Sequence, residues 1–238
     1  MSSAAHNGGR DGRFGLPLYR VSEAAGFVGV PPSTFGAWAH GYVRRPRGRP
    51  EVRVGPIVTS VPSARGEPSI PFIGLAEGIA VAAFRRAGVS MQHLRRAVDA
   101  LERQLGLEHA LASRRLYTDG AQVFYDFAET YDDRELQGLT IVVSGQRVFG
   151  DVVREYLDRV TYDEHGWAAL LVSPVTPSVA VDPARGFGQP IFLHGAARVE
   201  DVLDRFQAGE PLERVARDFG VPLKDIEDVV RARLPAAA

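Results

Sequence analysis

The residues best suited to chemistry in this 238-residue sequence are hydroxyl side chains and arginines near its N-terminus. A short helix predicted over residues 31–40 begins with Ser33 and Thr34, contains no acidic residue and ends at His40. Five arginines follow closely: Arg44, Arg45, Arg47, Arg49 and Arg53. The start of a helix offers free N–H groups to a phosphate, and arginine forks match the geometry of phosphate and guanine. These eight side chains are therefore predicted to bind double-stranded DNA.

Charge is distributed unevenly along the chain. Residues 1–65 contain nine arginines and three acidic residues, a local net charge of +6, whereas the whole chain has a formal net charge of -1. A basic N-terminal quarter on an otherwise acidic chain indicates contact with a polyanion at one end only. The competing interpretation of the arginine-rich stretch is a solvated loop.

The other residue types give no support for catalysis. Cysteine is absent, and the six histidines show neither His-x3-His nor His-Glu-x-x-His spacing. There is no glycine-rich phosphate loop and no nucleophile elbow. We therefore predict a protein that is not an enzyme and has no catalytic residue, no metal and no cofactor. No run of 18 apolar residues and no apolar secretion segment is present, which favours a cytoplasmic protein without membrane contact.

The N-terminal half is predicted to be mainly helical. Residues 21–40 have the spacing of two short helices around a turn at residues 28–32. Residues 44–59 are typical of a hairpin or wing, and residues 60–69 of a loop. Two helices follow within residues 71–105, which are a candidate dimer surface or, equally, plain core.

The middle of the chain is predicted to alternate between hairpins, a strand and a helix. These elements are a hairpin over residues 114–127 turning at Asp119-Gly120, a strand over 139–143, a helix over 149–160 with Val152, Val153, Tyr156 and Leu157 inward, and a hairpin over 161–172.

The C-terminal segment has three short helical patterns, preceded by a possible strand at residues 190–193. It repeats a pattern found near the N-terminus. A helix-turn-helix needs a small residue where its helices touch, a glycine in the turn and apolar residues on the second helix. Two sets of residues have these types, and in both sets successive members are four, six and three positions apart. The sets are Ala25, Gly29, Phe35 and Trp38, and Ala216, Gly220, Ile226 and Val229.

The chemistry of the two copies differs. The second helix of the C-terminal copy carries Asp225, Glu227 and Asp228 beside Lys224. Three carboxylates would repel a phosphate backbone. The N-terminal copy is therefore predicted to bind DNA, and the C-terminal copy to be an interaction module.

Several N-terminal motifs resemble the winged helix-turn-helix of MerR-like regulators. They are Leu18-Tyr19, Glu23-Ala24-Ala25, Val30-Pro31-Pro32-Ser33-Thr34-Phe35 and Trp38. The resemblance implies that a threonine starts the recognition helix and that a basic wing follows. The sequence departs from that family at Gly36, where an arginine is common.

The C-terminus resembles a small winged-helix domain found in many prokaryotic antitoxins. The resemblance lies in Pro190-Ile191, residues 195–199, Asp201-Val202-Leu203, Phe206, Gly209-Glu210, Val215-Ala216 and Gly220. Together the two resemblances are typical of the antitoxin of a VapBC-type module. They imply an antitoxin and autorepressor whose partners are its own promoter DNA and a PIN-domain ribonuclease toxin.

We thus expect a mainly α fold with small β-hairpins (α+β). The expected parts are a flexible tail over residues 1–16, a MerR-like DNA-binding and dimerisation region over 17–172, a linker over 173–178 and a three-helix winged-helix domain over 179–238. A homodimer is expected because two-fold DNA readers bind paired half-sites. Two alternatives remain open: a free-standing regulator that senses a small ligand, and a protein-interaction module that does not bind DNA.

Overall fold

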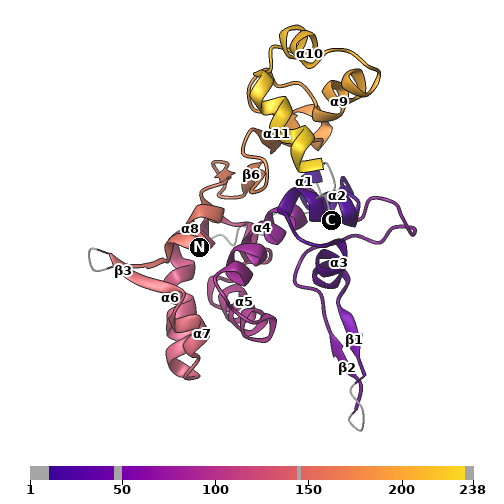
Figure 1. Cartoon of the computed structure of the whole chain (residues 1–238). Helices are drawn as coiled ribbons and strands as arrows, with labels where there is room; N and C mark the ends of the chain where they lie inside the picture. The colour runs from indigo at the N-terminus through magenta and orange to yellow at the C-terminus, as the bar shows by residue number, and fades with distance from the viewer. Residues whose placement is uncertain (1–10, 46–49, 144–145, 234–238) are drawn as a thin grey trace. The chain divides into compact units, whose positions relative to one another are not determined.

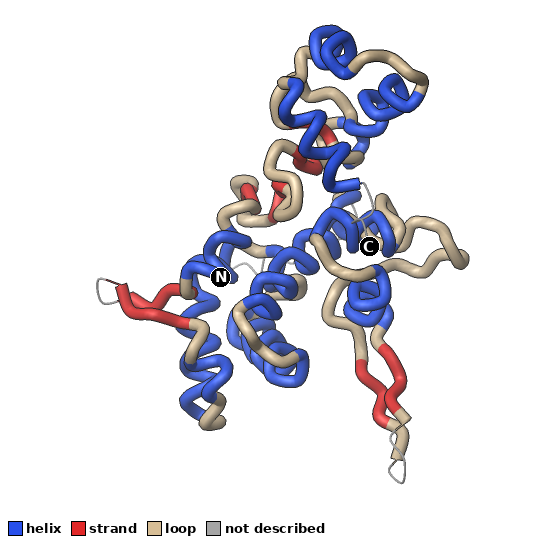
Figure 2. Tube along the Cα trace, in the orientation of Figure 1, coloured by secondary structure: helices blue, strands red, loops and turns tan. Residues whose placement is uncertain are grey.

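Residues 11–45, 50–143 and 146–233 are described by the computed structural model of the chain (Figure 1). The chain divides into two compact units. The first comprises residues 1–158 and 162–168, and the second comprises residues 159–161 and 169–238. As predicted, the fold is mainly helical with small antiparallel sheets (Figure 2).

The first unit consists of helices and two short hairpins. Its elements are α1 (Gly12–Gly15), α2 (Val21–Val28), α3 (Pro32–His40), β1 (Tyr42–Arg44), β2 (Val52–Val54), α4 (Phe72–Arg86), α5 (Met91–Leu105), η1 (Ala110–Ala112), α6 (Arg114–Thr130), α7 (Arg134–Gln137), β3 (Thr140–Val143), β4 (Gln146–Phe149) and α8 (Asp151–Leu157). Strands β1 and β2 form one antiparallel pair, and β3 and β4 form another.

Helix α4 is the centre of the first unit. Every residue from Phe72 to Phe84 is buried, and α2, α3, η1 and α8 all pack on this helix. A helix that is apolar all round must be enclosed on all sides. Of the two alternatives for residues 71–105, a dimer surface or plain core, α4 is therefore core within a single chain. Helix α5 is amphipathic and buries only one face, which contains Leu94, Val98 and Leu101.

Residues 114–130 form a helix, so the hairpin predicted over residues 114–127 is wrong. Leu116, Gly120, Val123 and Phe124 are buried at helical spacing along α6. Gly120 lies in mid-helix, where a Cβ atom would come within 3.4 Å of the Phe149 ring. The Asp-Gly pair that indicated a turn is thus a place of close packing, and tertiary contacts override the local turn signal.

The ordered chain begins before residue 17, contrary to the tail predicted over residues 1–16. Residues 1–10 lie outside the described residues, but Asp11 caps α1 by accepting a hydrogen bond from the Arg13 backbone N–H (3.0 Å). The Arg13 guanidinium also contacts Asp163 at 2.8 Å. Phe14 packs edge-on against Trp167, with ring centroids 5.1 Å apart. These contacts fasten a segment whose glycine-rich composition indicated flexibility.

Helix α8 is shorter than the helix predicted over residues 149–160, since Phe149 and Val160 belong to strands, and one residue of its predicted inner face is exposed. Val153, Tyr156 and Leu157 are buried, whereas Val152, which was predicted to face inward, is 49% exposed. Helix α8 is buried along one side only, and Val152 lies beyond the edge of the side that carries Val153, Tyr156 and Leu157.

The second unit contains three helices and most of a small sheet, whose residues Tyr162 and Ala168 are assigned to the first unit. Its strands follow the order β5-β6-β7-β8, where β5 is Val160–Tyr162, β6 is Ala168–Val172, β7 is Val179–Val181 and β8 is Ile191–Phe192. After the short helix η2 (Gly186–Gly188) and β8 come α9 (Val199–Gln207), α10 (Leu212–Phe219) and α11 (Leu223–Arg233). The three C-terminal helices and the short strand before them agree with the prediction.

The predicted linker over residues 173–178 lies inside this second unit. It connects β6 to β7, which pair directly with each other. Ser173 is buried, and its hydroxyl accepts hydrogen bonds from the N–H groups of Val175 and Thr176, both at 3.2 Å. The segment is thus a hydrogen-bonded loop within a sheet. The two units divide earlier in the chain, around residues 159–169.

Candidate nucleic-acid interface

Helices α2 and α3 form a helix-turn-helix whose turn depends on Gly29. This glycine has φ +81°, and its N–H donates to the Ala25 carbonyl at 2.9 Å. Glycine adopts this left-handed conformation without the steric cost that other residues bear. Ala25 is fully buried where the helices meet. Both residues therefore lie where the spacing argument places them.

Helix α3 buries one face and exposes a face of small side chains. Phe35 and Trp38 are 0% and 4% exposed, and their ring centroids lie 5.9 Å apart. On the opposite side, Ser33 and His40 are exposed, and Gly36 is half-buried between them. Small side chains allow a helix backbone to approach a groove floor closely, so this face suits entry into the major groove. Thr34, also proposed from the sequence, is half-buried.

Gly78 of α4 sets the position of α3. A Cβ atom at Gly78 would lie 2.6 Å from Cε2 of Phe35 and 3.0 Å from its Cζ. Both distances are shorter than ordinary van der Waals contact. The Phe35 ring therefore rests directly on the α4 backbone. Only glycine permits this approach.

The hairpin β1–β2 projects from the end of α3 (Figure 1). Its strands pair Tyr42 with Val54 and Arg44 with Val52. Gly41 makes the junction possible, because it has φ +69° and a Cβ atom there would lie 2.2 Å from the Val54 carbonyl oxygen.

The described arginines of the hairpin are exposed. The side chains of Arg45 and Arg53 are 80% and 85% exposed, and both contact Glu51, at 3.0 and 3.1 Å. Exposed ion pairs of this kind contribute only about 0–1 kcal/mol, so a phosphate can replace Glu51 at small cost. Arg44 is exposed too. Arg47 and Arg49 lie outside the described residues.

The chain that leaves the hairpin is hydrogen-bonded to the end of α3. The N–H groups of Ile57 and Val58 both donate to the Trp38 carbonyl, at 2.8 and 3.1 Å. The Ser60 hydroxyl donates to the Ala39 carbonyl at 2.8 Å. Helix α3 and the base of the hairpin are thus held as one piece.

A buried polar cluster fixes this piece to α4. Glu77 is the one charged residue in the buried stretch of α4, and its side chain is 5% exposed. Its carboxylate accepts hydrogen bonds from the Thr59 N–H and, at 3.0 Å, from the Thr59 hydroxyl. It also lies 2.9 Å from His109 Nδ1. This bond raises the pKa of His109 above its ordinary value, although burial opposes the shift. Together these contacts satisfy a carboxylate that would otherwise be costly to bury.

The cluster was not predicted from the sequence. A signal was present, since Glu77 is a single acidic residue in the apolar run Phe72–Phe84. A carboxylate at such a position requires a partner. Its partner His109 has the left-handed φ of +58°, which a histidine rarely adopts, and spacing alone could not identify it.

The C-terminal copy repeats the geometry with different surface chemistry. Gly220 has φ +64° and its N–H donates to the Ala216 carbonyl, while Ile226 and Val229 are buried. On α11, Lys224 pairs with Asp228. Hydrogen bonding to Lys224 lowers the pKa of the Asp228 carboxyl. The charges on this helix are therefore largely paired with one another.

Other kinds of site find little support in the part of the chain that the structure describes. No group of three or more histidine, aspartate or glutamate side chains there is arranged to hold a metal ion. None of the described helices is both long enough and apolar enough to span a membrane.

Helices α2 and α3, with the left-handed turn between them, define a helix-turn-helix protein. Comparison with known families agrees: residues 17–98 match the family described as "Putative DNA-binding HTH domain". Residues 179–231 match a second family, described as "Protein of unknown function (DUF433)".

Whole-chain relatives are found in Mycobacterium tuberculosis. The chain is 41% identical to "Putative antitoxin VapB45" over 92% of its own length and 95% of that protein. It is 26% identical to "Uncharacterized protein Rv2308", over 90% of this chain and 88% of that protein. The crystal structure of Rv2018 superposes with a TM-score of 0.78 at 38% identity, covering 92% of this chain and 99% of that chain. The chain therefore belongs to the VapB-type antitoxins that carry an N-terminal helix-turn-helix.

Proposed function

We propose that this antitoxin binds its own promoter as a homodimer and represses it, acting in the cytoplasm. The observation that carries the proposal is the acid-free outer face of α3 beside an arginine hairpin, both attached to the same buried cluster. Ser33, Thr34 and His40 contact DNA from α3, and Arg44, Arg45, Arg47, Arg49 and Arg53 bind phosphate. A homodimer presents two such units to paired half-sites.

The test is a fluorescence anisotropy titration with a labelled duplex from the upstream region of the gene, over a range of salt concentrations. Each arginine–phosphate contact adds about 0.9 to the slope of log affinity against log salt. Replacing all five hairpin arginines by alanine is thus expected to reduce the slope by up to about 4.5. The control replaces Arg86, Arg96, Arg103, Arg114 and Arg115, five arginines that are exposed on α4, α5 and α6. An equal reduction of the salt slope in the control variant would contradict the assignment of the phosphate contacts to the hairpin.

We further propose that the chain neutralises a PIN-domain ribonuclease. A nuclease of this class needs an acidic metal site, which an arginine-bearing segment of an antitoxin can block. The second unit, whose α11 charges are paired internally, is the proposed interaction module. Co-expression with the neighbouring toxin gene, followed by purification through a tag on this chain, tests the pairing. The five-arginine variant should keep the toxin, because the hairpin serves DNA. Recovery of the chain alone under conditions where both proteins are made would refute this part.

A further inference from the structure

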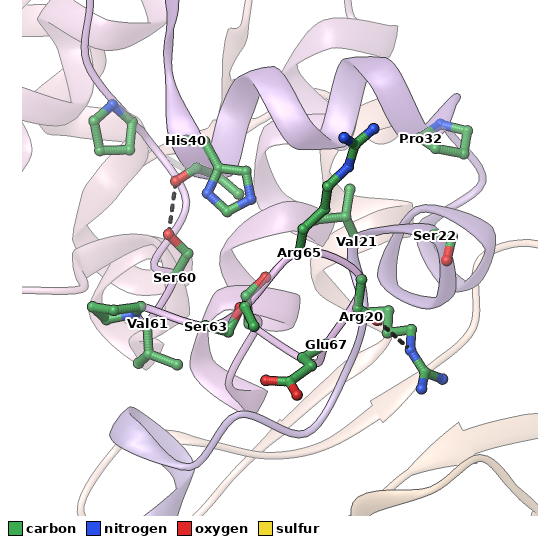
Figure 3. Close-up of a pocket in the computed structure, with 16 residues that line it drawn as sticks. Arg20, Val21, Ser22, Pro32, His40, Ser60, Val61, Ser63, Arg65 and Glu67 are labelled. Atoms are coloured by element: carbon green, nitrogen blue, oxygen red, sulfur yellow. Dashed lines mark hydrogen bonds between the residues drawn. The ribbon is translucent and has the colours of Figure 1, made fainter.

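A hollow of about 1110 Å³ lies beside α3 and is lined by residues from both ends of this helix (Figure 3). Pro32, at the start of α3, and His40, at its end, both line it. The facing wall is the loop of residues 60–69, and Arg20 to Ser22 at the start of α2 close one side. Residues 60–69 form a loop, as the sequence predicted.

The loop is held in a defined conformation. Its ends are joined by a hydrogen bond from the Val61 N–H to the Ser69 carbonyl at 2.8 Å. The Arg20 Nε donates to the Gly66 carbonyl at 2.7 Å, which ties the loop to α2. The loop is therefore a fixed part of the surface beside α3.

Arg65 lies at the tip of this loop. The Glu67 N–H donates to the Ala64 carbonyl at 3.1 Å, which closes a four-residue turn with Arg65 and Gly66 at its centre. Gly66 has φ +88°, the value that a type II turn requires at its third residue. The turn presents Arg65, which is exposed and lines the hollow. Among the described residues, no carboxylate lies within salt-bridge distance of its guanidinium.

The charges and hydroxyls of the hollow suit a phosphate group. Arg65 supplies an exposed guanidinium and His40 an imidazole, whereas the Arg20 guanidinium also contacts the Glu23 carboxylate at 3.2 Å and the Gly66 carbonyl at 2.7 Å. Hydroxyls of Ser22 and Ser63 stand among them, whereas the Ser60 hydroxyl donates to the Ala39 carbonyl. Glu67 is the one carboxylate among the lining residues, and Glu23 contacts Arg20 from outside the lining, so Arg65 is the lining cation best placed to bind a phosphate. Arginine forks and hydroxyls are the side-chain groups that bind phosphate oxygens most often.

We propose that this hollow binds a phosphate group, with Arg65 as the principal contact and Arg20 and His40 as supports. We expect the phosphate to come from the backbone of the duplex that α3 enters, and this choice of source rests on the DNA-binding function proposed above. A helix in the major groove lies between two phosphate strands. The hairpin extends from the end of α3, whereas the hollow lies between α3, the start of α2 and the 60–69 loop, so the two surfaces contact different phosphates.

The experiment compares Arg65→Ala, Arg65→Lys and Glu67→Gln with the wild-type chain and with the control Arg103→Ala on α5. Promoter affinity is measured by anisotropy at several salt concentrations. Arg65→Ala is expected to weaken binding equally for promoter and random duplexes and to lower the salt slope by about 0.9. Arg65→Lys should keep most of the slope because it keeps the charge. Glu67→Gln should strengthen binding, since it removes the opposing carboxylate.

A second arm titrates the DNA-free protein with inorganic phosphate and follows backbone amide shifts by NMR. Saturable shifts at residues 60–69 that vanish in Arg65→Ala, with promoter binding unaffected, would assign the hollow to free phosphate. Unchanged salt slopes in Arg65→Ala and no saturable phosphate shifts would overturn the proposal. If the wild-type chain fails to bind its promoter at all, the proposed function falls, and the phosphate titration still decides the hollow.

Discussion

Replacing Gly78 by alanine tests whether α3 is positioned by direct contact with the α4 backbone. The new Cβ would lie 2.6 Å from Phe35, and ordinary contact begins at 3.4 Å. The ring must therefore move by at least about 0.8 Å, the difference between these distances. Overpacking of a buried site costs about 1–3 kcal/mol. Alanine also gains about 1 kcal/mol over glycine in a helix interior, which offsets part of the loss.

Gly26→Ala is the matched control. Gly26 lies within α2, is exposed, and has no atom within 4 Å of a Cβ placed there. It receives the same helix gain without the overpacking, so Gly78→Ala should be less stable than Gly26→Ala by about 1–3 kcal/mol. In a chain of this size that corresponds to about 2–12 °C in Tm.

Both tryptophans, Trp38 and Trp167, lie in the first unit, so their fluorescence reports its unfolding directly. Urea titrations of the two variants should give separate midpoints, and Gly78→Ala should also bind the promoter more weakly because α3 is displaced. Equal midpoints would refute the reasoning, since they would show that Phe35 can move at no cost.

Three further outcomes follow from the geometry. Gly36→Arg, on the outer face of α3, should tighten promoter binding and raise the salt slope by about 0.9, as anisotropy would show, and an unchanged slope would place this face away from DNA. His109→Asn removes the partner of Glu77, and asparagine tolerates the left-handed backbone. Because the folded-state pKa of His109 is raised, its contribution to stability is complete below about pH 6.5 and is lost as pH rises through the folded-state pKa. Urea unfolding of the wild type between about pH 6 and 9 should therefore show a fall that His109→Asn lacks, and parallel profiles would contradict the pairing. Gly220→Ala meets no atom within 4 Å, so its cost is backbone strain alone, about 1–2 kcal/mol, visible as faster hydrogen exchange in α10 and α11.

The elements predicted correctly are those determined by residues close together in the sequence. The turn at Gly29 requires a left-handed residue, and the apolar positions Phe35 and Trp38 lie on one face of a helix, so α2 and α3 were predictable from the sequence. The same holds for Gly220 and Ile226 in the second unit.

The errors arise where contacts between residues distant in sequence determine the structure. Gly120 looked like a turn residue because the nearby Phe149, which requires a small neighbour, is distant in sequence. Glu77 and His109 are 32 positions apart, and only the folded chain brings them together. Arg65 belongs to a loop that is held by the hydrogen bond from Arg20 to the Gly66 carbonyl. A pattern of apolar residues cannot predict such a contact.

The burial of α4 on every side has a consequence for how this protein can evolve. The helices proposed to bind DNA and the helices α6 to α8 belong to a unit built around this one apolar helix. Recombination that transferred residues 17–70 alone would separate Phe35 from α4, on which it packs, and would expose one side of α4 in the protein that lost them. A change of promoter preference in this lineage is therefore expected to arise by substitutions on α3, the hairpin and the 60–69 loop. The second unit has its own core of Val202, Ile226 and Val229, and can be inherited or replaced as a separate piece.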